Sequence, residues 1–577
     1  MSDDIQVKKA TNSEEVAKYP WLASYPEGVD WHQKFIDAPL YQLLDEAVER
    51  FPDNICTNFL GRTMTYSDIG QQVNQIAGAL QRLGFQRGTK VGLFLPNCPT
   101  FIIYYYAILK AGGVVVNYNP LYTIEELSFQ IKDSETKFMV TLDLKVLFDK
   151  VEQLLANNVL ERAIVASFPA LLPGAKSVLF KMLKGKELAH PGRSAQASKV
   201  VLACDLPIED GRHRHITIDP VTEVAVLQYT GGTTGTPKGA MLTHSNVRIN
   251  ALQVSSWAPS LEDGVEKVFG ALPFFHVFAM TVVMNYGIAK GAELIIMPRF
   301  VLNDALKLID KTKPTVMPGV PTLFNAMLNH PKLKKFDLST LKFCLSGGAP
   351  LPLEVKEQFE KVTGCKVVEG YGLSETSPVV TCNPLYGKAK KGSIGMPVPA
   401  TYVSLRDLED PSKEVPHGEK GELCVKGPQV MLGYWGRPEE TAHVFVGDYL
   451  RTGDVARMDE DGMFSIEDRI KDLIICSGYN VYPRRIEEAF YTHVAVEEVI
   501  VIGIKDSYRG EAPKAFVKLK ESNAATAEEL MAHLAQKLSK IELPEVIEFR
   551  DELPKTMIGK LSKKELKAEE DAKSGSA

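Results

Sequence analysis

The stretch that decides the fold is Tyr229-Thr-Gly-Gly-Thr-Thr-Gly-Thr-Pro-Lys-Gly239, which follows the apolar run Glu223-Val-Ala-Val-Leu-Gln-Tyr229. The run is typical of a buried β-strand that leads into a loop. Glycines let a ligand approach the backbone, so N–H groups, threonine hydroxyls and Lys238 could surround a polyphosphate. Because the lysine lies between Pro237 and Gly239, this is not the common P-loop. A plain turn is the alternative, but turns rarely combine so much glycine and threonine with one lysine.

Length and composition are typical of an ordinary globular protein with several domains. The 577 residues are too many for a single hydrophobic core. Apolar residues make up 45% and charged residues 24%, as in soluble proteins. A net charge of −6 gives no reason to expect a nucleic-acid partner. The eight cysteines form no C-x-x-C pair, so we expect neither a zinc ribbon nor a disulfide framework, and a reducing cytoplasm fits best.

The sequence contains no evident signal peptide or membrane-spanning helix. Its start, Met1–Ala10, is charged and lacks an apolar centre. The longest apolar candidate, Phe278–Met297, is interrupted by Asn285, Lys290 and Glu293. We therefore expect a cytoplasmic protein that is at most peripheral at the inner face of the cell membrane.

One segment is a candidate for such peripheral contact. Between residues 171 and 186, three lysines lie opposite three apolar residues on a helical wheel, although Phe180 falls on the wrong side. This pattern is typical of a helix that lies on a membrane surface. A short insertion packed on the body of the protein is the alternative. The lysines are Lys176, Lys181 and Lys184, and the apolar residues are Val178, Leu179 and Met182.

Strand-like and helix-like segments alternate through most of the chain, which predicts an α/β fold. Residues 90–96 and 341–346 have the pattern of buried strands, and the second strand runs into Gly347-Gly-Ala-Pro350. Thr100 is expected to cap a helix that continues to Lys110. No fixed-period repeat is present, which argues against a solenoid.

The clearest domain boundary lies near Asp468-Arg-Ile-Lys-Asp472. Before it, residues 459–467 are expected to form a hairpin around an Asp-Gly turn. After it, about a hundred residues have a compact β-α-β-like pattern. We therefore expect a large unit over residues 1–467, a hinge over 468–472 and a small unit over 473–577.

Four more motifs follow the loop: Gly370-Tyr-Gly-Leu-Ser-Glu-Thr376, Thr452-Gly-Asp454, Asp468-Arg-Ile-Lys471 and Pro554-Lys-Thr-Met-Ile-Gly-Lys560. With the loop they resemble, in order and spacing, the phosphate, acidic, ribose, hinge and C-terminal lysine motifs of the adenylate-forming enzymes. This superfamily comprises acyl-CoA synthetases, luciferases and adenylation domains. The similarity extends over roughly residues 25–566.

Within the superfamily, the chain most resembles bacterial long-chain-fatty-acid–CoA ligases. The resemblance implies an AMP-forming ligase for medium- to long-chain fatty acids that uses ATP, Mg²⁺ and coenzyme A. It also implies a large multi-subdomain N-terminal domain for ATP and the acyl group, a small mobile α+β C-terminal domain and, at the level of the family only, a homodimer. An aryl-CoA ligase, an acyl-AMP ligase that loads a carrier protein, and a non-catalytic acyl or nucleotide sensor are the alternatives. The residues that suggest this subgroup are Tyr25-Pro-Glu-Gly-Val29, Leu95-Pro-Asn-Cys-Pro99, Asn119-Pro-Leu-Tyr122 and Asn480-Val-Tyr-Pro483.

The resemblance also implies which residues hold the nucleotide. Lys238 and the loop threonines would bind the β- and γ-phosphates. Asp454, supported by Arg469, would accept hydrogen bonds from both ribose hydroxyls, and Tyr371 would stack on adenine. The full implied ATP-binding set is Thr230, Gly231, Gly232, Thr233, Thr234, Gly235, Lys238, Gly348, Ala349, Pro350, Glu369, Gly370, Tyr371, Gly372, Ser374, Asp454, Arg469 and Lys560.

The implied reaction brings two anions together, so it needs charge neutralisation and alignment rather than a covalent protein nucleophile. Glu375 would hold Mg²⁺, a hard cation that prefers oxygen ligands. Lys560 would bridge the substrate carboxylate and the α-phosphate. Thr233 and His276 complete the implied catalytic set, and a structural core histidine is the alternative for His276.

The same resemblance assigns the acyl and CoA sites. Residues 277–287 are expected to form a helix that lines the acyl tunnel, although core packing explains this apolar spacing equally well. The C-terminal domain would rotate about Lys471 between the two half-reactions and withdraw Lys560. The implied acyl contacts are His276, Val277, Met280 and Gly348, and the implied CoA contacts are Ser477, Gly478 and Tyr479.

Overall fold

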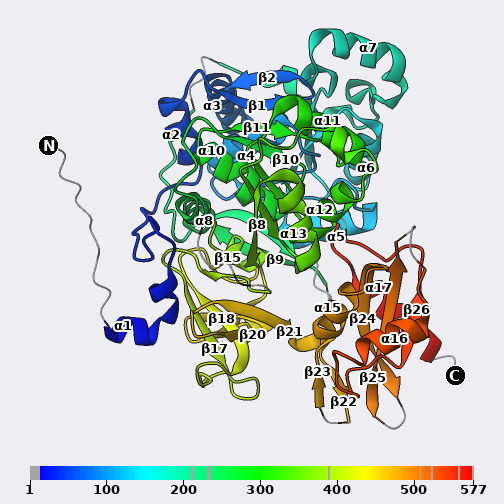
Figure 1. Cartoon of the computed structure of the whole chain (residues 1–577). Coiled ribbons are helices and arrows are strands. Elements are labelled where there is room, and N and C mark those ends of the chain that lie inside the picture. The colour runs from blue at the N-terminus through cyan, green and yellow to red at the C-terminus, as the bar shows by residue number, and fades with distance from the viewer. Residues whose placement is uncertain are drawn as a thin grey trace.

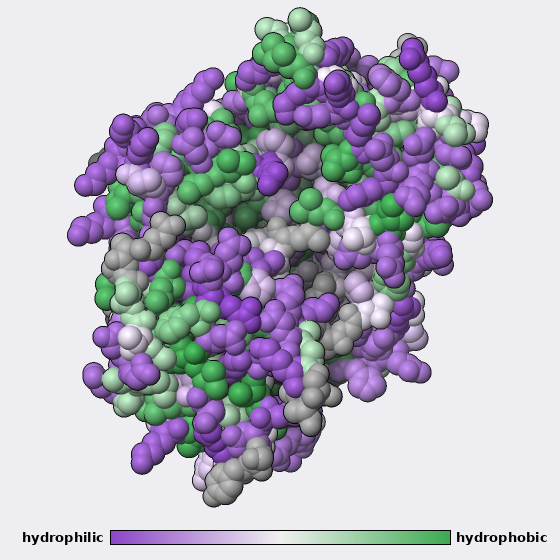
Figure 2. All heavy atoms as spheres, turned by 90° about the vertical axis from the view of Figure 1, so that its right-hand side faces the viewer, coloured by the Kyte–Doolittle hydropathy of each residue, from purple (hydrophilic) through white to green (hydrophobic). Residues whose placement is uncertain are grey.

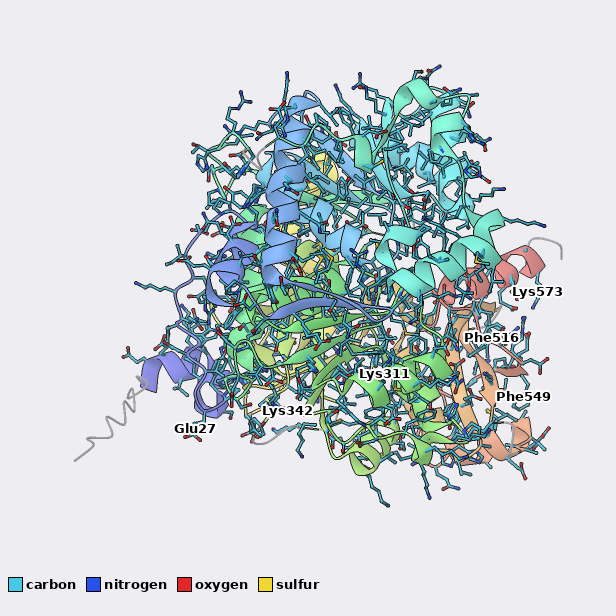
Figure 3. All side chains as sticks on the ribbon, turned by 90° about the horizontal axis from the view of Figure 1, so that it is seen from above. Glu27, Lys311, Lys342, Phe516, Phe549 and Lys573 are labelled. Carbon is cyan, nitrogen blue, oxygen red and sulfur yellow. The ribbon has the colours of Figure 1, made fainter. Side chains whose placement is uncertain are left out.

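The computed structural model describes residues 13–209, 213–230, 236–386, 390, 392–477, 479–506, 509–520, 524–556 and 559–574. Over these ranges the chain forms four β-sheets with helices around them (Figure 1). Three sheets belong to the large N-terminal part, and the fourth forms a small C-terminal domain at the lower right of Figure 1. Seen from above, this domain, with Phe516, Phe549 and Lys573, lies across the molecule from Glu27 (Figure 3). The predicted α/β class with a small C-terminal domain is confirmed.

A seven-stranded sheet carries the phosphate loop. Neighbouring strands are parallel except for the last pair, β8 and β9, which is antiparallel. Helices α4, α5 and α6 supply crossovers that parallel strands require. In sheet order the strands are β7 (Val200–Leu202), β6 (Arg162–Ala166), β5 (Phe138–Leu142), β3 (Lys90–Leu93), β4 (Val114–Asn117), β8 (Val224–Thr230) and β9 (Lys238–Thr243); the helices are α4 (Pro99–Lys110), α5 (Ile124–Ser134) and α6 (Lys145–Ala156).

A nine-stranded sheet carries the glycines of the predicted adenine slot. Its central strands are parallel, and antiparallel strands complete both edges. Helix α8 leads into this sheet from β9, and α11, α12 and α13 connect its successive parallel strands. In order the strands are β16 (Met396–Pro397), β15 (Val379–Cys382), β14 (Lys366–Gly372), β13 (Phe343–Gly347), β12 (Val316–Gly319), β10 (Lys267–Gly270), β11 (Glu293–Ile296), β1 (Ile55–Phe59) and β2 (Arg62–Thr65); the helices are α2 (Gln42–Arg50), α3 (Tyr66–Arg82), α8 (His244–Trp257), α11 (Leu302–Thr312), α12 (Pro321–Leu328) and α13 (Leu353–Thr363).

Two smaller sheets follow, one on each side of the predicted hinge. The hairpin expected over 459–467 is confirmed, because β20 pairs antiparallel with β21 and Gly462 has a φ of +76°. The last sheet, with α15, α16 and α17, has buried apolar clusters separate from the main core. The bounds are β17 (Tyr402–Arg406), β18 (Lys420–Lys426), β19 (Phe445–Val446), β20 (Tyr449–Met458), β21 (Phe464–Arg469), η10 (Ile470–Asp472), β22 (Ile474–Cys476), β23 (Tyr479–Val481), β24 (Val496–Asp506), β25 (Gly510–Leu519), β26 (Val546–Phe549), α14 (Pro438–His443), α15 (Pro483–Tyr491), α16 (Ala527–Leu534) and α17 (Lys563–Ser574).

Three local expectations differ from the structure in detail. Helix α4 begins at Pro99, so Thr100 lies in its first turn and the predicted cap is wrong; proline suits the first helical position because it lacks an N–H. The strand expected over residues 90–96 ends at Leu93. Residues 277–287 are helical, as expected, but a π-helical turn, η7 (Met280–Asn285), separates α9 (Val277–Ala279) from α10 (Tyr286–Ala289). In the described parts of the chain, no helix is both long and apolar enough to cross a membrane.

Candidate active site

The phosphate loop connects two strands that hold its ends together. Thr230 and Lys238 are register partners at the open end of the β8–β9 pair. The Tyr229 ring lies against Gly239, where a Cβ atom would come within 3.1 Å of it. The predicted loop residues Gly231, Gly232, Thr233, Thr234 and Gly235 lie outside the described residues.

A tyrosine connects Lys238 to the predicted metal ligand. The Lys238 Nζ lies 5.2 Å from the centroid of the Tyr434 ring, a cation–π arrangement. The Tyr434 hydroxyl donates to Glu375 Oε1 at 2.7 Å. The backbone carbonyl of Glu375 also accepts a hydrogen bond from Met431 N at 2.8 Å. The fold therefore places the end of the phosphate loop next to the acidic motif, with Tyr434 orienting the carboxylate.

The predicted ribose ligand is a buried carboxylate held on both sides. Asp454 is only 3% exposed, and its Oδ2 accepts a hydrogen bond from the Tyr371 hydroxyl at 2.5 Å. Its Oδ1 lies 3.2 Å from Arg469 Nε, because Asp454 and Arg469 are register partners on β20 and β21. Burial, followed by the charge of Asp454, raises the pKa of Tyr371 well above its usual value, so the hydroxyl stays a donor. Each carboxylate oxygen retains a lone pair for a further donor.

Glycines keep the end of β13 open. Gly347, the last residue of β13, is the register partner of Gly370 on β14, and a Cβ on Gly347 would meet the Phe278 ring at 2.9 Å. Gly348 follows with a φ of +83°, which favours glycine. A Cβ on Gly372 would collide with the carbonyl of Pro378. Ala349, Pro350 and Ser374 continue the loops that follow β13 and β14.

The catalytic lysine candidate reaches this opening from the C-terminal domain. A Cβ added to Gly348 would lie 2.8 Å from Lys560 Nζ, so the lysine passes directly over the glycine. Burial, with a further contribution from Arg469, lowers the pKa of Lys560 to about 8. Burial and the charge of Lys560 lower the pKa of His276 to about 3. The Thr322 hydroxyl donates to the carbonyl of Gly559 at 2.8 Å and ties the lysine segment to the N-terminal domain.

The acidic and ribose motifs lie within electrostatic reach of this lysine. The charge of Asp454, with smaller contributions that include Glu375, raises the pKa of Arg469. Arg469 in turn acts on Lys560. Five predicted residues from distant motifs therefore form one electrostatically linked group, and Lys560 connects this group to Gly348; we call this region the candidate cleft. The five residues are His276, Glu375, Asp454, Arg469 and Lys560.

The N-terminal part also contains a narrow apolar cavity. Leu345 of β13 and Val282 of η7 line it, together with Trp257 at the end of α8. The predicted acyl residues Val277 and Met280 are buried but are not among the residues that line this cavity. The sulfur of Met280 accepts a hydrogen bond from the Asn117 amide at 3.4 Å. The full lining is Val254, Trp257, Ala258, Val282, Tyr286, Val316, Pro318, Phe343, Leu345, Val379, Cys382, Leu385 and Val398.

The predicted CoA residues lie apart from the cleft. Ser477 has a φ of +53°, and its N–H donates to the Arg509 carbonyl at 2.7 Å. Tyr479 is 66% exposed, and Gly478 lies outside the described residues. Figure 1 shows β22 and β23 at the lower edge of the C-terminal domain, away from β8 and β9. The predicted hinge residue Lys471 lies in η10, between the last two sheets.

Comparison with known proteins agrees with this geometry. The family model described as AMP-binding enzyme matches residues 44–435, and the one described as AMP-binding enzyme C-terminal domain matches residues 485–560. The chain belongs to the AMP-binding enzyme family. A long-chain-fatty-acid–CoA ligase of Bacillus subtilis is 46% identical over 552 residues, which cover 96% of this chain and 98% of the relative. The protein of the same name from Yersinia pestis is 40% identical over 563 residues, covering 95% and 98%.

A solved structure has a similar fold. The ATP-bound structure of MatB from Rhodopseudomonas palustris superposes with a TM-score of 0.79 at 28% identity. The match covers 93% of this chain and all of MatB. The AMP-binding fold therefore accounts for both parts of the chain, including the C-terminal part that carries Lys560.

Sequence reasoning missed a largely buried carboxylate that supports the segments on both sides of the phosphate loop. Asp133 of α5 accepts the Tyr229 hydroxyl at 2.6 Å and pairs with Arg437 at 2.5 Å. Its backbone carbonyl accepts Trp435 Nε1 at 3.1 Å. Asp133, near the C-terminal end of α5, therefore holds both β8, the strand before the phosphate loop, and the segment that contains Tyr434. No local signal identifies Asp133, because its partners lie 96 to 304 residues away.

Glu369, another predicted nucleotide residue, is a half-buried carboxylate on β14. Its Oε1 accepts a hydrogen bond from Leu351 N at 3.3 Å. Burial raises the pKa of Glu369 to about 7, although the charge of Arg484 opposes the shift. The side chain thus connects β14 electrostatically with α15 of the C-terminal domain, near the slot that Gly348 opens.

Proposed function

We propose that this protein activates medium- to long-chain fatty acids with ATP and transfers them to coenzyme A, giving acyl-CoA, AMP and pyrophosphate. The observation that carries the proposal is the position of Lys560 over Gly348, within electrostatic reach of His276, Arg469 and Asp454. Lys560, a cationic side chain from the C-terminal domain, is thereby brought within electrostatic reach of the buried carboxylate of Asp454 and over the glycines at the end of β13. The relatives named above, which match the chain almost end to end, are named for this reaction.

The first half-reaction joins a carboxylate to the α-phosphorus of ATP and releases pyrophosphate. Thr230 and Lys238, with the loop between them, would hold the β- and γ-phosphates. Lys560, largely protonated at neutral pH, would bring positive charge to the two reacting anions. Asp454 and Tyr371 would fix the ribose and adenine. Nothing in this scheme requires a covalent bond to the protein, because positioning and charge neutralisation supply the catalysis.

Glu375 fits the role of a Mg²⁺ ligand. Only one of its oxygens, Oε1, is bonded to the Tyr434 hydroxyl, and the carboxylate borders the lysine of the phosphate loop. Carboxylate and phosphate oxygens are the ligands that Mg²⁺ prefers, and the ion would neutralise phosphate charge. The role of Tyr434 is then to hold Glu375 in one orientation.

His276 would act as a neutral hydrogen-bond donor. Its pKa of about 3 means that the ring is uncharged at physiological pH. Its Nδ1 accepts the backbone N–H of Phe278 at 3.3 Å, so the proton of the neutral ring lies on Nε2. An Nε2–H group beside Lys560 can donate to an oxygen of the acyl carboxylate without adding a second positive charge.

The apolar cavity favours an alkyl chain over a polar acid. Only apolar groups and a few weakly polar ones, such as the Tyr286 hydroxyl and Cys382, line it. An aryl-CoA ligase and an acyl-AMP ligase that loads a carrier protein remain the alternatives within the fold. ATP–pyrophosphate exchange with straight-chain and aromatic acids, followed by product analysis with and without CoA, separates them. Exchange with benzoate-type acids alone would overturn the proposed substrate class.

The second half-reaction would follow rotation of the C-terminal domain about Lys471. In the structure Lys560 lies over Gly348, while Ser477 and Tyr479 are exposed at β22 and β23, at the lower edge of the C-terminal domain (Figure 1). Rotation would withdraw Lys560 and bring the 477–479 segment, with its central glycine, to the acyl-adenylate. Because long acyl chains partition into lipid, we also propose that the enzyme acts while peripherally associated with a membrane.

Substitution of Lys560 tests the assignment directly. We expect Lys560→Ala to reduce acyl-AMP formation by about a thousandfold, because it removes the charge aligned with the reacting anions. Conversion of supplied acyl-AMP and CoA to acyl-CoA should be retained. The exposed neighbour Lys564→Ala is the control and should match the unchanged enzyme in both assays. Adenylation at nearly the original rate in Lys560→Ala would refute the role of this lysine.

A further inference from the structure

Helix α7 (Gly174–Lys184) presents an apolar face to solvent. None of its residues is buried. Val178, Leu179, Met182 and Leu183 are between 53% and 76% exposed. These four positions share one side of the helix, because residues three, four and five apart lie within about half a turn of each other. Figure 1 shows α7 projecting from the top of the N-terminal part, far from the C-terminal domain.

The opposite side of α7 fixes the helix to the body. The ring of Phe180 lies 5.0 Å from that of Phe168. Lys176 Nζ donates to the Leu60 carbonyl at 2.7 Å, in the turn between β1 and β2. Phe180, which the sequence placed on the wrong side, is therefore the anchor. The alternative of an insertion packed on the body holds for this face only, since more than half of the surface of each of the other four apolar residues is exposed to solvent.

An exposed patch of this kind needs a partner. Single exposed apolar residues are normal, but four large ones on one projecting helix mark an interaction surface. Figure 2 shows hydrophobic side chains at the top edge of the molecule, at the height of α7, with hydrophilic side chains below them. Within the described residues, this is the one helix of more than ten residues that has no buried side chain.

The charges around the patch are mostly positive. Lys176, Lys181, Lys184 and Lys186 belong to α7 or the turn after it, and Arg62 donates to the Ala170 carbonyl just before it. The acidic groups that face them are Glu187, 3.2 Å from Lys184, and Asp143, on which Lys181 acts electrostatically. Long lysine stems can extend past an apolar face and place their charge at its rim. Cationic groups around an apolar centre complement an anionic lipid surface.

We propose that α7 docks this protein onto a bilayer that contains anionic phospholipids, with Val178, Leu179, Met182 and Leu183 inserted among the acyl chains. The membrane is favoured over a protein partner because the apolar face lies on a projecting helix and the charges around it are mostly those of lysines. The link to substrate delivery rests on the proposed function, since long-chain fatty acids dissolve in the same bilayer. The docking itself does not depend on that function.

Vesicle flotation tests the docking. The full-length protein is mixed with vesicles of phosphatidylcholine alone, or of phosphatidylcholine with about 30% phosphatidylglycerol, which makes the vesicle surface negative. We expect binding to the anionic vesicles, and we expect Val178→Ser/Leu179→Ser/Met182→Ser/Leu183→Ser to reduce the partition coefficient by about tenfold or more. Ile36→Ser/Val494→Ser, which changes two apolar residues that are 79% and 72% exposed, is the control and should bind normally.

Charge reversal and activity assays complete the test. Lys184→Glu/Lys186→Glu should weaken binding to anionic vesicles only, whereas Lys537→Glu/Lys540→Glu should not. Every α7 variant should keep full activity with a short acid dissolved as monomer. Equal flotation of the serine variant and the unchanged protein would overturn the proposal. So would a lipid-free dimer that becomes monomeric in the serine variant, because α7 would then be a protein interface. Failure of the proposed function would instead appear as no acyl-AMP from any acid, with vesicle binding intact.

Discussion

The hydrogen bond between Tyr434 and Glu375 offers a sharp test of the site. Tyr434→Phe removes only the hydroxyl that donates to Glu375 Oε1 at 2.7 Å, while the ring beneath Lys238 is kept. Burial and Glu375 raise the pKa of Tyr434, so the hydroxyl is a neutral donor throughout the assay range. A hydrogen bond to a charged group contributes about 1.5–3 kcal/mol. Losing a group that orients a metal ligand typically costs about 10- to 100-fold in metal affinity or activity.

We therefore expect Tyr434→Phe to raise the Mg²⁺ concentration for half-maximal ATP–pyrophosphate exchange by about tenfold or more. The KM for the fatty acid should not change, because Tyr434 does not line the apolar cavity. Tyr434→Leu also removes the ring and should further raise the KM for ATP through its effect on Lys238. If Tyr434→Phe has the Mg²⁺ dependence of the unchanged enzyme, Glu375 is not held for metal binding as we argue.

Two further predictions concern proton state and chain length. Burial lowers the pKa of Lys560 to about 8, and under the proposed function adenylation needs the cationic form, so kcat/KM for adenylation should fall as the pH rises through about 8. In Lys560→Arg this alkaline decline should disappear. If the decline persists in Lys560→Arg, it belongs to another group. Val282→Phe should narrow the apolar cavity and lower kcat/KM for long acids by about tenfold or more while sparing short ones, since overfilled cores resist added methylenes. An unchanged chain-length profile, measured by AMP release with CoA present, would show that this cavity does not hold the acyl chain.

Local sequence predicted the parts of the fold that depend on local chemistry. The dense glycines and threonines after β8 indicated a phosphate loop, and the Asp461-Gly462 pair indicated the hairpin that β20 and β21 form. The π-helical turn over Met280–Asn285 was not predictable, because an added residue in a helical turn leaves the apolar pattern nearly unchanged. Thr100 was misjudged as a cap because Pro99 can itself begin a helix.

The candidate site was predicted through its motifs but not through its supports. Tyr371 was expected to stack on adenine, yet the structure adds a 2.5 Å hydrogen bond from its hydroxyl to Asp454, 83 residues away. Asp133 and Tyr434 escaped notice for the same reason. Their partners lie on distant segments, and a single acidic or aromatic residue has no local pattern that distinguishes support of a site from ordinary packing. The sequence predicted an amphipathic α7, but only the fold reveals which of its faces is covered.

Under the proposed function, the position of Lys560 would explain why the protein needs two domains. In the observed arrangement the lysine lies directly over Gly348, where its charge would serve the adenylation step. Among the described residues, one contact that holds the lysine segment there is the neutral hydrogen bond from Thr322 to Gly559. A neutral hydrogen bond contributes only about 0.5–1.5 kcal/mol, so its loss need not delay rotation about the 468–472 segment. Strengthening this contact should therefore favour adenylation at the expense of thioester formation, an imbalance that single-turnover assays of the two half-reactions would resolve.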